Sequence, residues 1–259
     1  MSAQPDTTFV TSFDPNPADM YQADKGIAIW SFEEDIFLVN GYVKPQGGRT
    51  CTIYKVDANT LEIEQEIDLE GPQGDLAITA YVVTEDGHIV LTGEWRDYAA
   101  NNTMRMFLAK YTADLEEVWT RYYPDFAETS LYSESIVETE TGDYLFYLSN
   151  QVEPSYSELR VLKTDSSGYL FSLDTFLPDT LFTTYGHGNL VPTTDGNYLV
   201  SSKAVHYGDY DINTGVVHKM DTWGNPLWTW HLPFIPYDRQ PPVCTWLPDG
   251  GGVLMWMDD

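Results

Sequence analysis

Apolar and polar positions alternate in short runs along this chain, and the runs recur. Four segments consist of a short turn followed by an alternating strand: TEDGHIVLTG (84–93), TETGDYLFYLS (139–149), TTDGNYLVSS (193–202) and LPDGGGVLMW (247–256). A period of two residues is typical of a half-buried β-strand, and Asp-Gly or Gly-Asp turns supply the positive φ that tight hairpins need. The pattern therefore predicts β-hairpins, with helix nearly absent.

The hairpins and their flanking lysines are spaced almost evenly along the chain. The turn glycines Gly87, Gly142, Gly196 and Gly250 are 55, 54 and 54 residues apart. The lysines Lys55, Lys110, Lys163 and Lys219 are 55, 53 and 56 residues apart. A fixed period of this length indicates a repeat architecture. We expect the lysine stems to cover apolar surface, or their ammonium groups to pair with neighbouring acids.

Each full period predicts four strands. The expected strands are 26–32, 36–43, 50–57 and 61–69, then 76–83, 88–95, 104–111 and 115–123, then 132–138, 143–151, 157–164 and 169–177, then 186–192, 197–205, 215–220 and 226–232. Four-stranded antiparallel units at this spacing are typical of the blades of a β-propeller. We therefore predict one all-β propeller domain over 1–259, with repeats at about 20–75, 76–131, 132–185, 186–240 and 241–259.

The fifth repeat is incomplete. Residues 241–259 supply two strands, and TTFVTSF (7–13) has the pattern of an outer strand with no partner before it. Pairing the two ends within residues 1–15 and 241–259 would close a ring and remove an exposed sheet edge. This predicts five blades closed by the N-terminal strand; a fragment of a larger propeller is the alternative.

The fourth repeat, TDGNYLVSS followed by VVHKMDTWGNPLWTW, resembles repeats of secreted bacterial propeller proteins of the Bacteroidetes type. The resemblance covers residues from about 20 to 259 and implies a β-propeller fold and an exported or cell-surface location. The first repeat departs from the pattern because it lacks the turn glycine. The start of the chain, MSAQPDTTF, has no apolar leader core, although SAQ resembles the end of a bacterial signal peptide.

Charge excludes some partners. The chain has 40 acidic and 13 basic residues, a net charge of −27. Nucleic-acid binding needs clustered Lys and Arg, so we expect no nucleic-acid partner. No apolar run approaches about 18 residues, so we expect no membrane insertion. The acidity suits solubility in salty or extracellular surroundings, or several Ca²⁺ sites.

We expect a monomer, and we leave open whether Cys51 and Cys244 are paired or buried free thiols.

Binding residues are expected on the longer loops, which propeller topology gathers at one end. Tyrosine combines a large rigid ring with a polar tip, which suits protein or glycan recognition. The alternative is that these rings only pack loop against loop. The candidates are Tyr21, Tyr98, Phe126, Tyr156, Tyr185, Tyr207, Tyr210 and Tyr237.

Two sets of residues with side-chain oxygens are candidates for other chemistry. Asp209, Asp211 and Asn213 have the spacing of the first ligands of a Ca²⁺ loop, although a plain turn fits as well. Asp24, Asp75 and Asp238 lie near the start of predicted inner strands, where paired carboxylates could hydrolyse a glycosidic bond. The five histidines lack zinc-ligand spacing, and no nucleotide-binding or nucleophile motif is present.

The sequence therefore favours a non-catalytic exported or cell-surface module that binds a protein or glycan, without a required cofactor. A five-bladed carbohydrate-active enzyme using the three aspartates is one alternative. A structural segment of a longer surface protein is another.

Overall fold

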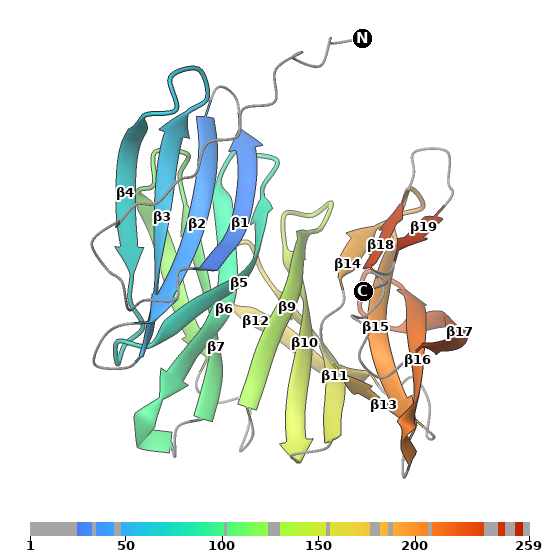
Figure 1. Cartoon of the computed structure of the whole chain (residues 1–259). Helices are drawn as coiled ribbons and strands as arrows, with labels where there is room; N and C mark the ends of the chain where they lie inside the picture. The colour runs from blue at the N-terminus through green and yellow to red at the C-terminus, as the bar shows by residue number, and fades with distance from the viewer. Residues whose placement is uncertain are drawn as a thin grey trace.

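The computed structural model describes residues 25–32, 35–43, 48–100, 103–123, 130–153, 156–176, 182–185, 189–206, 209–235, 243–246 and 252–255. They form successive antiparallel sheets, which confirms the predicted all-β class (Figure 1). The first sheet contains β1 (Lys25–Phe32), β2 (Asp35–Val43), β3 (Arg49–Asp57) and β4 (Ile63–Leu69). The second contains β5 (Leu76–Val83), β6 (Ile89–Asp97), β7 (Thr103–Tyr111) and β8 (Glu117–Tyr123). The third contains β9 (Ser130–Glu138), β10 (Tyr144–Glu153), β11 (Tyr156–Thr164) and β12 (Leu170–Phe176).

The fourth sheet departs from the predicted pattern at its inner edge. Two short strands, β13 (Phe182–Tyr185) and β14 (Leu190–Pro192), both pair with β15 (Tyr198–His206), where one strand was expected at 186–192. The sheet continues through β16 (Asp209–Met220) to β17 (Pro226–Ile235). A last pair, β18 (Val243–Trp246) and β19 (Gly252–Met255), begins a fifth unit.

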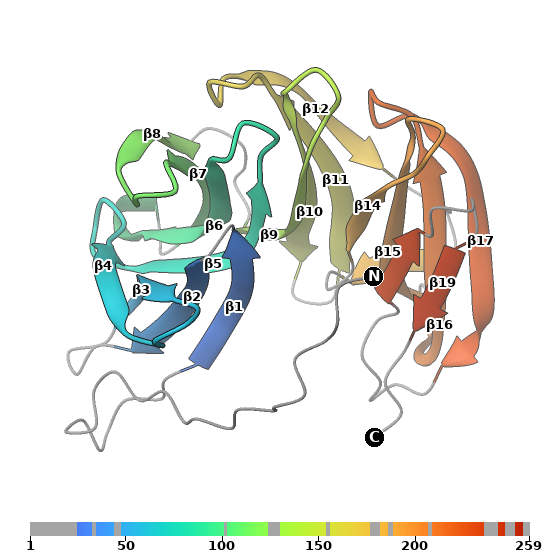
Figure 2. The same ribbon diagram turned by 90° about the horizontal axis from the view of Figure 1, so that it is seen from above.

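The sheets stand side by side in an arc (Figure 2). Strands β1, β5, β9 and β14 lie on its inner side, and β4, β8, β12 and β17 lie on its outer side. Strand β1 lies at one end of the arc, and the β18–β19 pair lies at the other. The expected closing strand, residues 7–13, lies outside the described residues, so ring closure and the number of blades stay predictions.

The tight turns repeat their hydrogen bonds from sheet to sheet. In the first–second strand turns, the N–H groups of Gly87, Gly142 and Gly196 donate to the carbonyls of Thr84, Thr139 and Thr193. All three glycines have φ between 75° and 78°, which side chains with a Cβ rarely adopt. The sequence pattern therefore encodes these corners directly.

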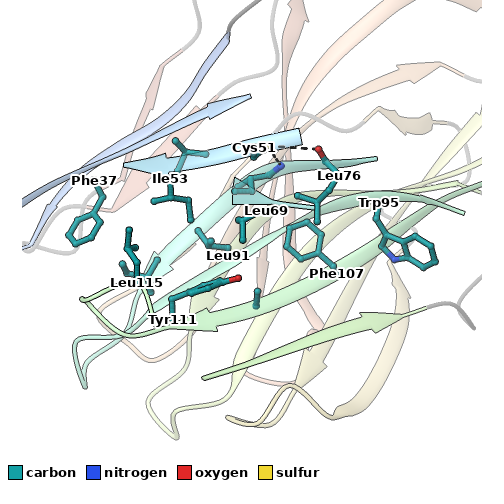
Figure 3. Close-up of a cluster of buried hydrophobic side chains, with 14 residues drawn as sticks. Phe37, Cys51, Ile53, Leu69, Leu76, Leu91, Trp95, Phe107, Tyr111 and Leu115 are labelled. Atoms are coloured by element: carbon teal, nitrogen blue, oxygen red, sulfur yellow. Dashed lines mark hydrogen bonds between the residues drawn. The ribbon is translucent and has the colours of Figure 1, made fainter. Parts of the chain in front are cut away.

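Packing between neighbouring sheets buries their apolar faces. The first and second sheets share a cluster that includes Phe37, Ile53, Leu91, Phe107 and Leu115 (Figure 3). Similar clusters join the second sheet to the third and the third to the fourth. No single sheet could cover both of its apolar faces, so each near-copy is stabilised by the next.

Each evenly spaced lysine forms an ion pair within its own sheet, and Lys55 also pairs with Asp114 of the second sheet at 3.0 Å, which confirms the expected pairing with neighbouring acids. The Nζ atoms of Lys55 and Lys110 lie 3.2 Å from carboxylate oxygens of Asp35 and Asp86. The remaining pairs are Lys163 with Asp143 and Lys219 with Asp195. Because each acid lies at or beside the first turn of its sheet, the four ion pairs lie at the same end of successive sheets.

Candidate functional site

A polar cluster lies at the opposite end of the first two sheets, where the longer connections meet. Arg49 begins β3, Asp75 directly precedes β5, and Glu94 and Arg96 lie near the end of β6. Tyr98 begins a short 3₁₀ helix, η1 (Tyr98–Ala100). We call this group the loop-end cluster; its members are Arg49, Gln73, Asp75, Glu94, Arg96, Asp97, Tyr98 and Arg105.

Asp75 is the centre of the loop-end cluster and is almost completely buried. Its Oδ1 accepts a hydrogen bond from the backbone N–H of Arg49 at 2.9 Å and lies 3.3 Å from the Arg49 Nε. Its Oδ2 lies 2.9 Å from the Nε of Arg96 and accepts the hydroxyl proton of Tyr98 at 3.1 Å. Both oxygens are therefore engaged, by two guanidinium groups, one amide and one phenol.

A second line of contacts extends the cluster across the second sheet. The Nη2 of Arg49 lies 3.5 Å from the Oε2 of the buried Glu94. Gln73 accepts the backbone N–H of Tyr98 at 2.7 Å and donates to Asp97 at 3.2 Å. These bonds fix η1 against the connection that precedes β5, and so they orient Tyr98.

The surroundings of Asp75 hold it ionised. Burial alone would raise the pKa of its carboxyl, but the Arg49 N–H, the Arg49 charge and the Tyr98 hydroxyl outweigh burial and lower the pKa below its usual value. Desolvation and the bond to Asp75 raise the pKa of Tyr98, so this phenol stays protonated and donates. At neutral pH the site is a fixed carboxylate surrounded by donors.

The outer surface of the loop-end cluster is partly exposed to solvent. The Tyr98 residue is 46% exposed, and the side chains of Arg49 and Arg96 are 35% and 37% exposed. The Nε of a third arginine, Arg105, lies 3.9 Å from Asp97. Three arginines therefore stand beside three carboxylates, so formal charge balances within a chain of net charge −27. The arrangement presents an aromatic ring beside planar, hydrogen-bonding groups held by a buried anion.

Of the sequence-predicted candidates, Asp75 and Tyr98 are brought together. Tyr21, Asp24, Phe126, Tyr207, Tyr237 and Asp238 lie outside the described residues. The convergence of the three aspartates on one site therefore stays a prediction.

Three tyrosines expected in loops belong to strands instead. Tyr156 begins β11, Tyr185 ends β13, and Tyr210 lies in β16. The expectation that they occupy loops was wrong, because aromatic and β-branched residues such as those of Phe182–Tyr185 favour extended backbone. Only the strand positions of these three residues are described.

The expected Ca²⁺ loop is also a strand. Asp209, Asp211 and Asn213 lie in β16, whose pairing with β15 includes Val205 opposite Asn213. Tyr210 and Ile212 alternate with the three polar residues, and that period of two is typical of a strand rather than a turn. The loop prediction was wrong at this point, whereas metal binding by these three residues stays a prediction. Among residues with described side chains, no metal-binding group of three His, Cys, Asp or Glu was found.

Sequence reasoning missed the arginines of the cluster. Three of the six arginines in the chain, Arg49, Arg96 and Arg105, flank the second–third strand connections of the first two repeats. That concentration was a usable signal, because basic residues are scarce elsewhere in the chain. Cys51 is a free, buried thiol, which answers for this residue the question that the sequence left open.

No protein-family model matches the sequence, and no curated protein matches it. Solved structures do share its fold. A protein of unknown function from Dyadobacter fermentans is 14% identical with a TM-score of 0.62, over 86% of this chain and 71% of that one. A Hadza microbial sialidase is 12% identical with a TM-score of 0.56, over 85% of this chain and 50% of that one.

A third similar structure is the GH93 α-L-arabinofuranosidase of Fusarium graminearum in complex with arabinobiose. It is 12% identical with a TM-score of 0.54, over 85% of this chain and 71% of that one. Within the described residues, no helix is long and apolar enough to cross a membrane. At such identities the likeness shows the fold alone: this chain is an all-β protein of four-stranded antiparallel sheets, similar to propeller-fold structures.

Proposed function

We propose that this chain is a non-catalytic propeller module that binds glycans at the loop-end cluster. The observation that carries the proposal is the state of Asp75, whose two oxygens are both engaged while the Tyr98 ring beside it remains exposed. The buried carboxylate acts as an anchor that fixes the arginines and the tyrosine. The ligand would meet the ring and the outer guanidinium edges.

The contacts of Asp75 favour binding over hydrolysis. A general acid must carry a proton at working pH, which requires a raised pKa, whereas the pKa of Asp75 is lowered. A carboxylate nucleophile needs an accessible oxygen, whereas the Asp75 side chain is only 4% exposed. Its role is thus positional.

The chemistry around Asp75 suits a hydroxyl-rich ligand. Tyrosine offers an apolar ring with a polar tip, and arginine presents several donors in one plane. The balanced charge of the cluster imposes little selection for a charged sugar, so neutral glycans are the expected class. The names of two proteins of similar fold, a sialidase and an α-L-arabinofuranosidase, indicate that those two proteins act on sugars. This agrees with the proposal without carrying it.

A glycan array followed by calorimetry of the best ligand tests the proposal. Tyr98→Ala is expected to weaken binding about tenfold or more, because it removes the exposed ring and one donor. Tyr169→Ala is the matched control, since Tyr169 is also exposed but lies in the turn before β12. That turn is at the end of the sheets that carries the lysine ion pairs, opposite the loop-end cluster. Equal loss of affinity in the two variants would contradict the proposed site.

Hydrolysis assays address the enzyme alternative. Wild-type protein is expected to release no reducing sugar from the glycan that it binds. Turnover that Asp75→Asn abolishes while binding persists would replace the binding proposal by a carbohydrate-active enzyme. Adding Ca²⁺ during thermal unfolding tests the metal prediction, because a bound ion raises the melting temperature.

We also propose an exported or cell-surface location, in keeping with the acidic composition and the resemblance of the repeats. Labelling of intact cells with a membrane-impermeant reagent, followed by detection of this chain, tests that location. Labelling only after lysis would contradict it.

A further inference from the structure

One arginine lies between two aromatic rings where the second and third sheets meet. Arg121 is in β8, and its guanidinium carbon, Cζ, lies 4.7 Å from the centroid of the Tyr169 ring and 5.7 Å from that of the Trp119 ring. Tyr169 belongs to the turn before β12, and β8 and β12 both lie on the outer side of the arc (Figure 2). We call these three residues, which come from two sheets, the rim cluster.

A glycine brings the two sheets close enough for this stacking. A Cβ placed on Gly168 would lie 2.9 Å from the Trp119 ring and 3.1 Å from the Cγ of Arg121, so a side chain there would overlap both. The carbonyl of Gly168 also accepts the hydroxyl proton of Tyr123 in β8 at 2.6 Å. The turn is thus fixed on β8, where it contacts the stem of Arg121 and sets Tyr169 beside the guanidinium.

Two members of the rim cluster depart from the repeat. Arg121 lies opposite Leu108 in the strand ladder, and Tyr169 closes the hydrogen-bonded turn that begins at Asp165. The residue pairs at the corresponding positions of the first–second and third–fourth junctions are Ile67 with Glu116 and Asp174 with Asn225. Those sheets stack without an arginine or a tyrosine at these positions, so stacking alone does not account for the pair.

Arg121 also differs from the arginines of the loop-end cluster, because it has no carboxylate partner in the described part of the chain. Arg49, Arg96 and Arg105 each lie beside a carboxylate. The guanidinium of Arg121 makes one hydrogen bond, from Nη1 to the carbonyl of Thr120 at 3.2 Å, and its Nε is buried with no acceptor among the described residues. A guanidinium has five N–H donors, so most of those of Arg121 are unused.

The next junction has a similar ring contact in which the charge is neutralised. The Nζ of Lys163 in β11 lies 4.4 Å from the centroid of the Trp223 ring, in the turn before β17. The same Nζ lies 3.6 Å from a carboxylate oxygen of Asp143. A cation on an aromatic ring therefore has its carboxylate at the third–fourth junction. At the second–third junction the described residues supply none, which leaves the guanidinium to a carboxylate from outside the chain.

We propose that the rim cluster binds the carboxylate of a uronic acid residue in a glycan. Arginine presents planar donors that match the two oxygens of a carboxylate, and the Arg121 side chain is partly exposed. Tyr169 is 61% exposed and adds apolar surface for the face of a sugar ring. This second site does not rest on the proposed function: charge is balanced at the loop-end cluster and unbalanced at Arg121.

The charge of the whole protein restricts the ligand to one with few carboxylates. A net charge of −27 repels a polyanion. Negative charge also lies next to the rim cluster, since the Oδ1 of Asp165 accepts the backbone N–H of Tyr169 at 2.8 Å and Glu117 begins β8. An acidic peptide or a polyuronate would bring several charges to this surface, whereas a single uronate in an otherwise uncharged glycan brings one, for Arg121.

Calorimetric titration of the full-length protein with the methyl glycoside of glucuronic acid tests the proposal. The methyl glycoside of glucose, with a hydroxymethyl group in place of the carboxylate, is expected to bind about tenfold or more weakly. Arg121→Gln should weaken glucuronide binding by about the same factor, and Arg121→Lys by less, because the charge remains. Lys163→Gln is the matched control: it removes a ring-stacked cation at the next junction and should leave glucuronide binding unchanged.

Other outcomes would overturn the proposal. Wild-type protein that fails to bind the glucuronide at millimolar concentration, or that binds the glucoside equally well, would show that no carboxylate is recognised. Glucuronide binding that persists in Arg121→Gln would place the ligand elsewhere. Tighter binding of a short acidic peptide than of the glucuronide would assign the rim cluster to a peptide carboxylate.

Three variants separate the rim cluster from the proposed glycan site. Tyr98→Ala should bind the glucuronide as the wild type does, and Arg121→Gln and Tyr169→Ala should keep their affinity for the neutral glycan. Tyr169→Ala should weaken glucuronide binding about threefold or more. Because Tyr169 is exposed, this variant should stay folded, so it tests the proposal even if Arg121→Gln does not fold. Loss of both affinities in one folded variant would contradict two separate sites.

Discussion

The two ends of the sheets differ. One end, the turn end, carries the tight turns and the lysine ion pairs, and the other, the loop end, carries the longer connections and the loop-end cluster. At the turn end, a lysine ion pair occurs in all four sheets, and a threonine–glycine turn occurs in the second, third and fourth. At the loop end, the cluster around Asp75 occurs between the first two sheets and joins residues from three separate connections. Repetition serves stacking, because every sheet must present the same shape to its neighbour. Among the described residues the loop-end cluster has no copy in the other sheets, and it is there that we propose glycan binding.

The largest expected effect comes from the centre of the loop end. Asp75→Ala removes a buried carboxylate and leaves Arg49 and Arg96 without their anion, so we expect a loss of about 3 kcal/mol in the free energy of unfolding. Chemical denaturation measures the loss. Glycan affinity should fall as well, because Tyr98 loses its acceptor. A stable variant that still binds glycan would remove Asp75 from the site.

Alanine substitutions at two glycines of the turn end, Gly142 and Gly168, can be compared directly. Gly168 and Gly142 have nearly equal positive φ, 77° and 76°, but only a Cβ on Gly168 would meet Trp119. Gly142→Ala should cost about 1 kcal/mol from backbone strain alone, and Gly168→Ala about 2 kcal/mol or more from strain and overlap. Equal melting temperatures for the two variants would contradict the overlap of a Gly168 Cβ with Trp119, whereas glycan binding should be unchanged in both.

Acid should weaken the loop end through Asp75. Because the folded-state pKa of this group is lowered, its contribution to stability is present above the unfolded pKa near 3.8 and is lost as pH falls through the folded value. Comparing urea unfolding of the wild type and Asp75→Asn between pH 7 and pH 2 isolates this contribution. The difference between the two proteins should shrink in acid; a constant difference would mean that the charge of Asp75 does not stabilise the fold.

The core between the two ends, where Cys51 is buried, gives a prediction that needs no substitution. Burial raises the pKa of this thiol to about 11, so it stays protonated at neutral pH. Native protein should therefore react with a thiol reagent at Cys51 at least about a hundredfold more slowly than unfolded protein. Peptide mapping after labelling separates Cys51 from Cys244. Rapid native labelling of Cys51 would show that the shared core of the first two sheets opens readily.

Most of the architecture could be predicted from local patterns. The turn glycines and the evenly spaced lysines placed most strands of the first three sheets within one or two residues of their observed bounds. The longest error falls in the fourth repeat, where Asp209, Asp211 and Asn213 were assigned to a loop because Asp and Asn are uncommon in strands. Their alternation with Tyr210 and Ile212, and pairing with β15, kept the chain extended.

The sequence by itself determined the repeated features of this protein, because positive-φ turns and alternating strands depend on residues close together in the chain. Only the tertiary structure decided that Arg49 and Arg96 meet at Asp75. Arg96 lies beside Asp75 because β5 pairs with β6 in the second sheet, whereas Arg49, 26 positions from Asp75, reaches it only because the first sheet stacks on the second. A period in the sequence specifies the shape of each sheet, whereas ion pairs between distant connections depend on how neighbouring sheets are aligned, which no local pattern records.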